Sequence, residues 1–472
     1  MWHFEQPPAW QSADTAQFLA VVNANSRYFD SKPLQVGRAP GRLDLMGGIA
    51  DYSGALVLEL PLAVATFVAA QLIDEAIFEV FSPDLATLGE QPWLRLPLET
   101  LEAITEQKQL AGSWASYPMG VWLMLQRAYQ LPTDRGIRLF IHSEVPVGKG
   151  VSSSAALEVA TLQALVGLYG LELSGKEAAL LCQKAENNVV GAPCGIMDQM
   201  SVACGQADHL LMLRCQPAEL EGNIKLPPDL AVWGLDSGIR HAVTGADYGS
   251  VRVGAFMGYR LVAELAGLKA APVSGQLVKI EDPLWQGYLA NISPSLWESQ
   301  YQDKIPLELK GAAFLKRWGG TTDPVTQIDP YRTYPLRQAT AHPIYENQRV
   351  QLFRSLLKLQ TEDEASTENR NQLLGELMYQ SHQSYSRCGL GSSGTDQLVE
   401  LVRWAGPASG LYGAKITGGG SGGTVAVLGK REAFAAIKQV VTQYEAETNY
   451  NPLILSGSSP GAMAFGSLRL VL

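Results

Sequence analysis

One local unit constrains the fold more than any other part of the chain: a strand, a glycine-containing loop and a helix follow one another between 136 and 170. In GIRLFIHSEV (136–145), apolar residues alternate with mostly polar ones, which predicts a half-buried strand. After the loop, Ser152 is a candidate N-cap and Gly170 a stop signal. The apolar residues that recur between them at the helical period are Ala155, Val159, Leu162, Val166 and Tyr169.

The loop of this unit, PVGKGVSSSAALEVA, has the composition of a phosphate-binding turn. Gly148 and Gly150 let the backbone approach a phosphate closely, and the free N–H groups of the first helical turn supply donors at the positive end of the helix dipole. The loop is not a Walker A motif, because Ser143 and Gly150 stand where that motif has glycine and Ser or Thr, so Lys149 is not given the Walker lysine role. Taken alone, the loop is better explained as a strand-to-helix turn with a serine cap that binds nothing, and only the other motifs reverse that interpretation.

A length of 472 residues predicts two domains, which we expect over 1–232 and 233–472, although no linker marks the boundary. The net charge of −10 disfavours nucleic acid as a partner, because that affinity needs many Lys and Arg. The sequence shows neither a long uncharged apolar run nor a basic, apolar leader, so no membrane contact is expected. Five cysteines without a CxxC pair favour a reduced, cytoplasmic setting.

Other segments give coarser expectations. The sequence predicts an amphipathic helix over 12–30 and a strand from about 34 that runs into the glycine-rich GRAPGRLDLMGGIADYSG (37–54). A tryptophan-rich stretch covers 275–330. Toward the end, KITGGGSGGTVAVLG (415–429) is followed by the helical pattern REAFAAIKQVVTQYEAE.

Four segments, in this order, resemble the motifs of the GHMP kinases, the family of galactokinase, homoserine kinase, mevalonate kinase and phosphomevalonate kinase. They are GRAPGRLDLMGGIADYSG, which is similar to the galactokinase motif, PVGKGVSSSAALEVA, AENNVVGAPCGIMDQM (185–200) and KITGGGSGGTVAVL. The resemblance implies the two-domain α+β fold of GHMP kinases, with an N-terminal βα domain like that of a small ribosomal protein and a ferredoxin-like α+β C-terminal domain.

Within the family, the segments VSSSAALEVA, VVGAPCGIMDQM, HPIYENQRV and CGLGSSGT are most similar to the kinase part of plant L-arabinokinases. This likeness implies a sugar 1-kinase that uses ATP and Mg²⁺ to convert L-arabinose into L-arabinose 1-phosphate. A galactokinase that acts on D-galactose is one alternative. A non-catalytic sugar-sensing regulator is another, but such relatives tend to lose part of the phosphate loop, and SSSAA is intact here.

The resemblance also assigns roles to single residues. Asp198 is expected beside the reacting sugar hydroxyl as a base or an electrostatic stabiliser, with Arg42 facing it. Ser154 and Glu186 are expected to bind Mg²⁺, which prefers oxygen ligands. The residues expected to bind the nucleotide are Pro146, Gly148, Lys149, Gly150, Val151, Ser152, Ser153, Ser154, Gly418, Gly419 and Gly420.

The residues expected to bind the sugar are Arg42, Gly48, Ile49, Asp51, Gly195, Asp198 and Tyr248. Galactokinases carry Glu-His where this chain carries Gly48 and Ile49, and the acidic side chain serves the hydroxymethyl group that L-arabinose lacks. A buried carboxylate without a partner costs about 1–3 kcal/mol, so a pentose site is expected to lose the acid and fill the vacated volume. Neutral drift in a galactokinase, or a changed backbone path, is the alternative.

Overall fold

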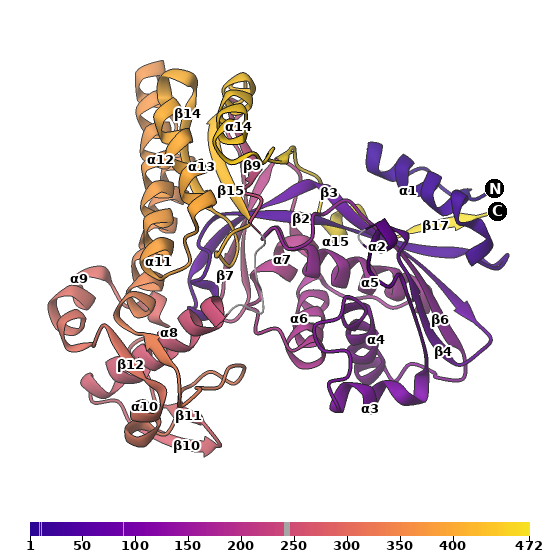
Figure 1. Ribbon diagram of the computed structural model, residues 1–472, viewed down its shortest axis with the longest axis horizontal. Helices are drawn as coiled ribbons and strands as arrows, with labels where there is room; N and C mark the ends of the chain where they lie inside the picture. The colour runs from indigo at the N-terminus through magenta and orange to yellow at the C-terminus, as the bar shows by residue number, and fades with distance from the viewer. Residues whose placement is uncertain (9, 11, 88, 240–245) are drawn as a thin grey trace.

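Two β-sheets form the framework of the protein, with helices packed on both (Figure 1). The computed structural model describes residues 1–8, 10, 12–87, 89–239 and 246–472. Within these residues the first sheet has nine strands, in the order β1-β17-β2-β3-β6-β4-β5, with β7 paired to β3 and β8 paired to β7. They are β1 (His3–Phe4), β2 (Leu34–Met46), β3 (Leu56–Ile73), β4 (Ile77–Phe81), β5 (Trp93–Pro97), β6 (Gly136–Ser143), β7 (His209–Arg214), β8 (Glu219–Lys225) and β17 (Leu468–Val471).

Helices cover both faces of the first sheet. On one face, α4 (Ser116–Tyr129), α5 (Ser153–Tyr169) and α6 (Gly175–Ala185) share a hydrophobic core with β2, β3 and β6. On the other face, α1 (Ala13–Ala24) and the short turn η1 (Ser26–Tyr28) share a second core with the same three strands. The shorter elements nearby are α2 (Pro83–Thr87), η3 (Leu98–Thr100), α3 (Leu101–Glu106), α7 (Met197–Cys204) and α15 (Ala462–Phe465).

Strand β6 is present where the sequence predicted it, but the prediction that it is half-buried is wrong. Leu139 packs on the α4 and α5 side, while Phe140 packs on the α1 side, and both are fully buried. Arg138, the polar residue just before them, is mostly covered and forms an ion pair with Glu79 (Nε to Oε1, 2.7 Å). The single strand pattern could not reveal that α1 covers its second face.

Helix α5 confirms the predicted unit closely. It starts after Ser152 and ends at Gly170, which adopts the left-handed conformation that favours glycine (φ 65°). The predicted helix over 12–30 is shorter than expected, because α1 ends at Ala24 and the chain turns through η1. The predicted strand from 34 continues through Met46, so most of the first glycine-rich motif is extended.

The second sheet has four strands in the order β14-β15-β9-β16, all antiparallel. They are β9 (Leu230–Asp236), β14 (Leu411–Ile416), β15 (Thr424–Lys430) and β16 (Ile454–Ser456). The helices α13 (Ser393–Ala405) and α14 (Phe434–Thr448) pack on it. The short turn η8 (Pro407–Ser409) leads into β14.

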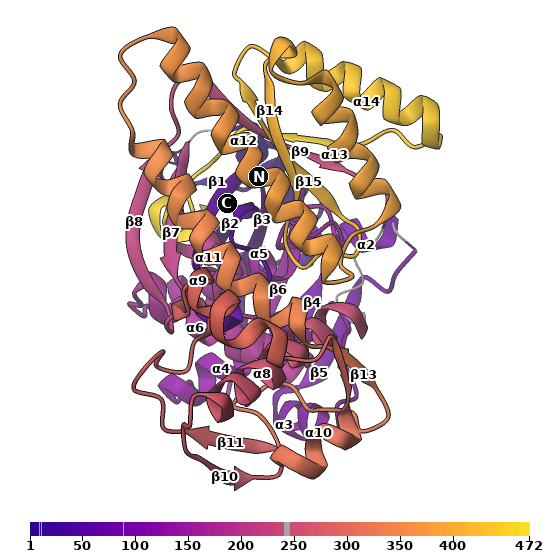
Figure 2. The same cartoon turned by 90° about the vertical axis from the view of Figure 1, so that its left-hand side faces the viewer.

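Two long helices, α11 (Arg337–Lys358) and α12 (Glu364–Arg387), lie side by side and join the two sheets (Figure 2). One hydrophobic cluster combines Val350 of α11 and Met378 of α12 with Leu58 of the first sheet and Val232 of the second. The sheets therefore share a core and do not pack as separate units.

A third layer, at the lower left of Figure 1, surrounds α8 (Ala246–Leu265) and contains the tryptophan-rich stretch. Its core includes the buried Trp285 and Trp297 together with Ile344 of α11. Its other elements are β10 (Ala270–Ser274), β11 (Leu277–Ile280), η5 (Leu289–Asn291), α9 (Pro294–Leu296), η6 (Trp297–Tyr301), η7 (Gln302–Lys304), β12 (Glu308–Lys310), α10 (Gly311–Trp318) and β13 (Thr333–Pro335).

The mixed α+β class expected from the sequence is confirmed. The expected boundary at 232/233 falls inside β9, and β17 pairs with β2 in the first sheet, so the division into 1–232 and 233–472 stays a prediction. None of the helices in the described part of the chain combines the length and the hydropathy that a membrane crossing requires.

A buried ion pair anchors α1 to the first sheet, and its removal should weaken the fold. Arg38 of β2 is fully buried and donates from Nε (2.9 Å) and Nη2 (2.7 Å) to Oδ2 of Asp14. Asp14→Ala leaves this cation without its carboxylate, so we expect a loss of about 3–5 kcal/mol in the free energy of unfolding, measured by urea denaturation. Asp30→Ala, which removes an exposed pair with Lys32, should lose about 1 kcal/mol or less. Equal losses in the two variants would contradict the assignment.

Candidate active site

One cavity brings together most of the residues that the sequence singled out. Its walls come from the end of β2 and the turn after it, the loop before α5, the segment 186–198, the start of α8 and the β14–β15 hairpin. The predicted site residues that line it are Arg42, Ile49, Asp51, Gly148, Gly150, Ser152, Ser153, Ser154, Glu186, Gly195, Asp198, Tyr248, Gly418 and Gly419. Segments more than 350 residues apart in sequence therefore meet at one site.

Four residues expected to bind the nucleotide lie outside the cavity wall. Val151 is buried in the core below the loop, and its carbonyl accepts a hydrogen bond from the backbone N–H of Arg42 (3.1 Å). Lys149 points away to Asp236, with Nζ 2.8 Å from Oδ2. Gly420 packs against Leu390, because a Cβ there would lie 2.8 Å from the leucine. The fourth is Pro146.

The N-terminus of α5 is open toward the cavity. Ser152 holds the N-cap position in the left-handed conformation (φ 60°), and its side chain makes no capping hydrogen bond. Its Oγ is buried without a partner in the described structure. The first N–H groups of a helix have no partner within the helix, so this uncapped end offers donors and a positive dipole to an anion. The predicted phosphate cradle thus has the expected local geometry.

The glycine-rich hairpin packs directly on the phosphate loop. A Cβ on Gly418 would lie 2.7 Å from the carbonyl oxygen of Gly150, and one on Gly423 would lie 2.7 Å from that of Lys149. Both glycines also have positive φ (70° and 80°). Side chains at these positions would push the hairpin off the loop, so the glycines allow two backbone segments to close one wall of the cavity.

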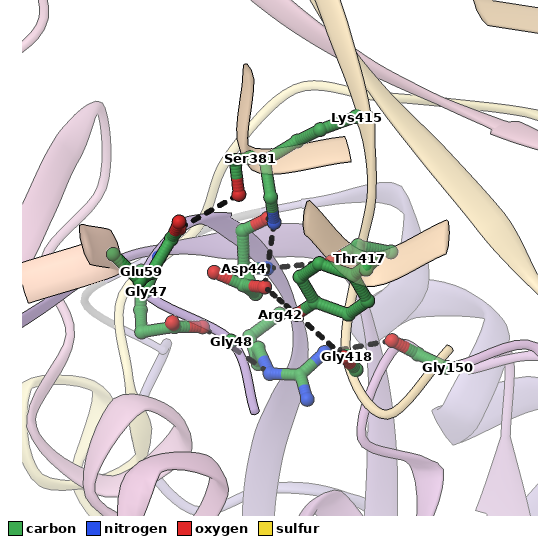
Figure 3. A network of polar contacts seen from close by, with 12 residues as sticks. Arg42, Asp44, Gly47, Gly48, Glu59, Gly150, Ser381, Lys415, Thr417 and Gly418 are labelled. Atoms are coloured by element: carbon green, nitrogen blue, oxygen red, sulfur yellow. Dashed lines mark hydrogen bonds and ion pairs between the residues drawn. The ribbon is translucent and has the colours of Figure 1, made fainter. Parts of the chain in front are cut away.

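Arg42 and Asp198 form the predicted contact. Nη2 and Nε of Arg42 donate to the same carboxylate oxygen, Oδ1 of Asp198, at 2.6 and 3.1 Å. The arginine is also 3.2 Å from Glu59 Oε2, and its Nη1 donates to the carbonyl of Gly150 at 2.7 Å (Figure 3). Arg42 is 3% exposed and Asp198 26% exposed, so the aspartate is the member of the pair that a ligand in the cavity reaches.

Glu186 belongs to a cluster of buried carboxylates that the sequence did not reveal. It begins a π-helical turn, η4 (Glu186–Val190), and a loop follows at 191–196. Gln199 Nε2 bridges Glu186 Oε2 (2.6 Å) and Glu158 Oε2 (3.1 Å). Burial, with help from the charge of Asp198, raises the pKa of Glu186 to about 7, while hydrogen bonds from Cys194, Ser154 and Gln199 act against this rise. Burial and then Glu186 raise the pKa of Glu158 well above its usual value.

This cluster fits a divalent cation. The hydroxyl of Ser154 and the carboxylate of Glu186 hydrogen-bond to each other and both line the cavity, which gives the oxygen donors that Mg²⁺ prefers. The buried Oε1 of Glu158 has no partner among the described residues, and a cation bound beside it would favour the ionised form of both carboxyl groups, which burial now disfavours. A helical spacing of four residues between Ser154 and Glu158 was the signal that could have found the second carboxylate.

Asp51 and Gly195 meet at the end of the cavity expected to hold the sugar. A Cβ on Gly195 would overlap Oδ2 of Asp51, so only glycine leaves room for this carboxylate. Burial and then the charge of Asp198 raise the pKa of Asp51 to about 6, and Arg252 opposes this rise. The side chain of Arg252 is held by Asp323 (Nη2 to Oδ1, 2.8 Å) from the tryptophan-rich stretch.

Side chains of α11 form hydrogen bonds with the backbone of the turn after β2. The backbone N–H of Gly47 donates to Glu346 Oε1 (3.1 Å), and the carbonyl of Gly48 lies 3.0 Å from His342 Nε2. Burial lowers the pKa of His342 to about 4, so the ring is neutral near pH 7. Since a carbonyl only accepts, Nε2 carries the proton, and Nδ1 accepts from Ser384 Oγ (2.7 Å).

Position 48 does not present its side chain to the cavity, which corrects the expectation for Gly48. A Cβ there would overlap the hydroxyl of Tyr385 and Oδ2 of Asp44. The glycine is required because α12 and β2 approach this turn closely. Ile49, in contrast, lines the cavity as expected and adopts a left-handed conformation (φ 50°), which is unusual for a β-branched residue.

Beneath the cavity, a buried polar network joins the two sheets (Figure 3). Lys415 Nζ of β14 lies 2.7 Å from Asp44 Oδ2 of β2, and both side chains are fully buried. The hydroxyl of Tyr385 lies 3.1 Å from the same oxygen and 2.9 Å from the carbonyl of Gly418. Thr417 Oγ1 accepts from the N–H of Asp44 (2.7 Å). No motif pointed to Lys415 or Tyr385 as supports of the site.

Comparison with known proteins places these features in a family context. Three family models match: the GHMP kinases N-terminal domain over 116–206, the GHMP kinases C-terminal domain over 363–446 and the galactokinase galactose-binding signature over 26–72. The chain is 43% identical over 488 residues to an L-arabinokinase of Arabidopsis thaliana, covering 92% of this chain but only 46% of that protein. It is 31% identical over 456 residues to a galactokinase of Chloroflexus aggregans, covering 96% of this chain and 99% of that protein.

Solved structures show the same fold. A Lactococcus lactis galactokinase in complex with galactose superposes with a TM-score of 0.73 at 22% identity, over 96% of this chain and 99% of that one. An L. major mevalonate kinase in complex with R-mevalonate superposes with a TM-score of 0.54 at 16% identity, over 92% and 100% of the two chains.

The close contact between Gly195 and Asp51 leads to a stability prediction. Gly195→Ala forces the added methyl group against the buried carboxylate, so we expect a loss of about 1–3 kcal/mol in the free energy of unfolding, measured by denaturant titration. Gly249→Ala on α8 is the matched control, since a Cβ there meets nothing within 4 Å. It should leave stability unchanged or raise it by up to about 1 kcal/mol. A Gly195 variant as stable as the Gly249 variant would show that Asp51 moves freely.

Proposed function

This chain belongs to the GHMP kinase family and, within it, to the galactokinase-like sugar kinases, and on that premise we propose that it phosphorylates L-arabinose at the anomeric hydroxyl. The reaction transfers the γ-phosphoryl group of ATP and gives L-arabinose 1-phosphate and ADP. The observation that carries the proposal is the Arg42–Asp198 pair in the same cavity as the uncapped N-terminus of α5. A base or charge stabiliser thus lies beside an anion site, as phosphoryl transfer to an alcohol requires.

In this mechanism, Asp198 acts on the sugar hydroxyl. Its carboxylate either accepts the hydroxyl proton as the new O–P bond forms or stabilises the partial positive charge on the still protonated oxygen as it attacks. Arg42 holds the carboxylate through Oδ1, which leaves Oδ2 outside the pair and available to the substrate. Because Arg42 also binds Gly150, it positions the acid and the phosphate loop together.

The phosphate side of the reaction falls to α5, the glycine hairpin and the carboxylate cluster. The N–H groups at the start of α5 bind phosphate oxygens, and Gly418 and Gly419 let backbone close over them. Ser154 and Glu186 would hold Mg²⁺, which neutralises charge on the β- and γ-phosphates when bound. Gln199 fixes Glu186 in place through its 2.6 Å hydrogen bond.

Two findings support L-arabinose over D-galactose. The Arabidopsis L-arabinokinase is 43% identical to this chain, whereas the galactokinases of Chloroflexus aggregans and Chloroflexus aurantiacus are 31% and 29% identical. Ile49 supplies an apolar wall at the end of the cavity that also carries Asp51 and Tyr248, and it would take the volume of a hydroxymethyl group. A galactokinase remains the second candidate, since the match to the Chloroflexus enzyme covers nearly both chains.

The role of Asp198 can be tested by removing its charge while keeping its shape. Asp198→Asn should fold and bind sugar, but kcat should fall by about 100-fold or more because the variant neither accepts a proton nor stabilises positive charge on Arg42. Steady-state kinetics with coupled ADP detection measures this loss. Asp303→Asn, at an exposed position on η7, is the control and should retain activity. A near wild-type kcat in the Asp198 variant would exclude this residue from the chemistry.

Sugar choice tests the finer proposal. The wild-type protein should show a kcat/KM for L-arabinose about 10–200-fold above that for D-galactose, the range typical of discrimination by pocket shape. Ile49→Ala should reduce this ratio by about tenfold, because it reopens the volume that the hydroxymethyl group needs. Ile344→Ala removes the same atoms from the same core cluster but does not line the cavity, so its ratio should match wild type. Equal kcat/KM values for the two sugars in the wild type would leave a galactokinase-like kinase without arabinose preference.

A further inference from the structure

A second cavity lies outside the active site, between α11, α12 and the segment 297–307 of the third layer. Figures 1 and 2 show α9, which leads into this segment, beside α11. Its volume is about 600 Å³, within the range of small-molecule sites, and it shares no lining residue with the active-site cavity.

Three arginines from two helices line this cavity, and their hydrogen-bonding capacity is only partly used. Arg387, at the end of α12, is exposed and has no hydrogen bond or ion pair with any described residue. Arg337 donates only from Nε, to the carbonyl of Ile305 (2.8 Å). Arg349 donates from Nε to Glu346 Oε2 (2.7 Å), and its buried Nη2 makes no hydrogen bond with a described residue. Planar guanidinium groups with free N–H donors are the usual receptors for phosphate.

The remaining wall suits a neutral polyhydroxyl body. Gln338 and Gln383 present amide groups that both donate and accept hydrogen bonds, and Ser384, whose proton is donated to His342, presents a hydroxyl oxygen that accepts. Glu298 is the one acidic lining residue, and it already accepts from the hydroxyl of Tyr345 (2.6 Å).

Two short hydrogen-bonded paths lead from this cavity to the turn that carries Ile49. Ser384, a lining residue, donates to His342, which donates to the carbonyl of Gly48. Arg349, also a lining residue, pairs with Glu346, which accepts from the N–H of Gly47. Both paths end within two residues of the wall of the sugar site.

We propose that this cavity is a binding site for a phosphorylated sugar, and that its occupancy changes the affinity of the active site for sugar through His342 and Glu346. The arginines take the phosphate, and the amide and hydroxyl groups take the sugar body. The binding site stands independently of the proposed function, whereas its effect on sugar affinity rests on it.

The binding part is tested by calorimetry on the full chain with its active site saturated by sugar, Mg²⁺ and a non-hydrolysable ATP analogue. Glucose 6-phosphate should bind with one further equivalent, inorganic phosphate should bind more weakly, and glucose should not bind. Arg387→Gln should lower the affinity for both anions about tenfold or more, because a charged hydrogen bond is lost. The control Arg27→Gln, an exposed arginine on η1, should bind as wild type. Absence of heat with both anions at about 10 mM, or unchanged binding in Arg387→Gln, overturns the site.

The coupling part is tested by measuring sugar affinity without nucleotide, with and without saturating glucose 6-phosphate. We expect a change of about fivefold or more, and an equal change in glucose 6-phosphate affinity when sugar is bound, because linkage is reciprocal. The effect should vanish in Arg387→Gln, which keeps wild-type kcat without the anion. An unchanged sugar affinity in the wild type overturns the coupling. Both measurements are of binding, so a failure of phosphoryl transfer would appear only in the kinase assay.

Discussion

The buried charge of Arg42 is the interaction on which the active-site cavity depends. One guanidinium group, almost wholly removed from solvent, contacts Glu59 of β3, Asp198 of α7 and the carbonyl of Gly150 in the phosphate loop. A buried cation that loses a partner destabilises a protein by several kcal/mol, so β3, α7 and the loop are each held to β2. Arg42 therefore fixes Asp198 and the loop before α5 relative to each other.

A second constraint comes from the far side of the cavity wall. Ile49 adopts a conformation that costs an L-residue about 1–2 kcal/mol, and it persists because its neighbours are fixed by other parts of the chain. Glu346 and His342 bind the backbone just before it, and Asp44 is locked to Lys415. The shape of the sugar end is thus determined by α11 and β14 as much as by the motif that contains it.

The sequence predicted what depends on local pattern and missed what depends on distant contacts. Helix α5 followed from its cap, period and terminal glycine, all within a few residues. The pairing of Arg42 with Asp198 was accessible only through family resemblance, since 156 residues separate them. Lys415 and Glu346 both lie in segments that the sequence singled out, but their supporting roles stayed hidden because their partners lie about 300 residues or more away. Gly48 was expected to face the cavity, but the identity of a residue in a turn does not tell in which direction a side chain at that position would point.

The first sheet cannot be completed until β17, which is synthesised more than 400 residues after β2, becomes available to pair with it. Strand β17 lies between β1 and β2, so among the described strands β1 is attached to the sheet only through residues 468–471. A ribosome adding about 5–20 residues per second needs roughly 20 to 85 seconds to pass from β2 to β17. During that time one edge of β2 stays unpaired, and open edges invite pairing with other chains. The nascent protein should therefore depend on chaperones until β17 has left the ribosome and paired with β2.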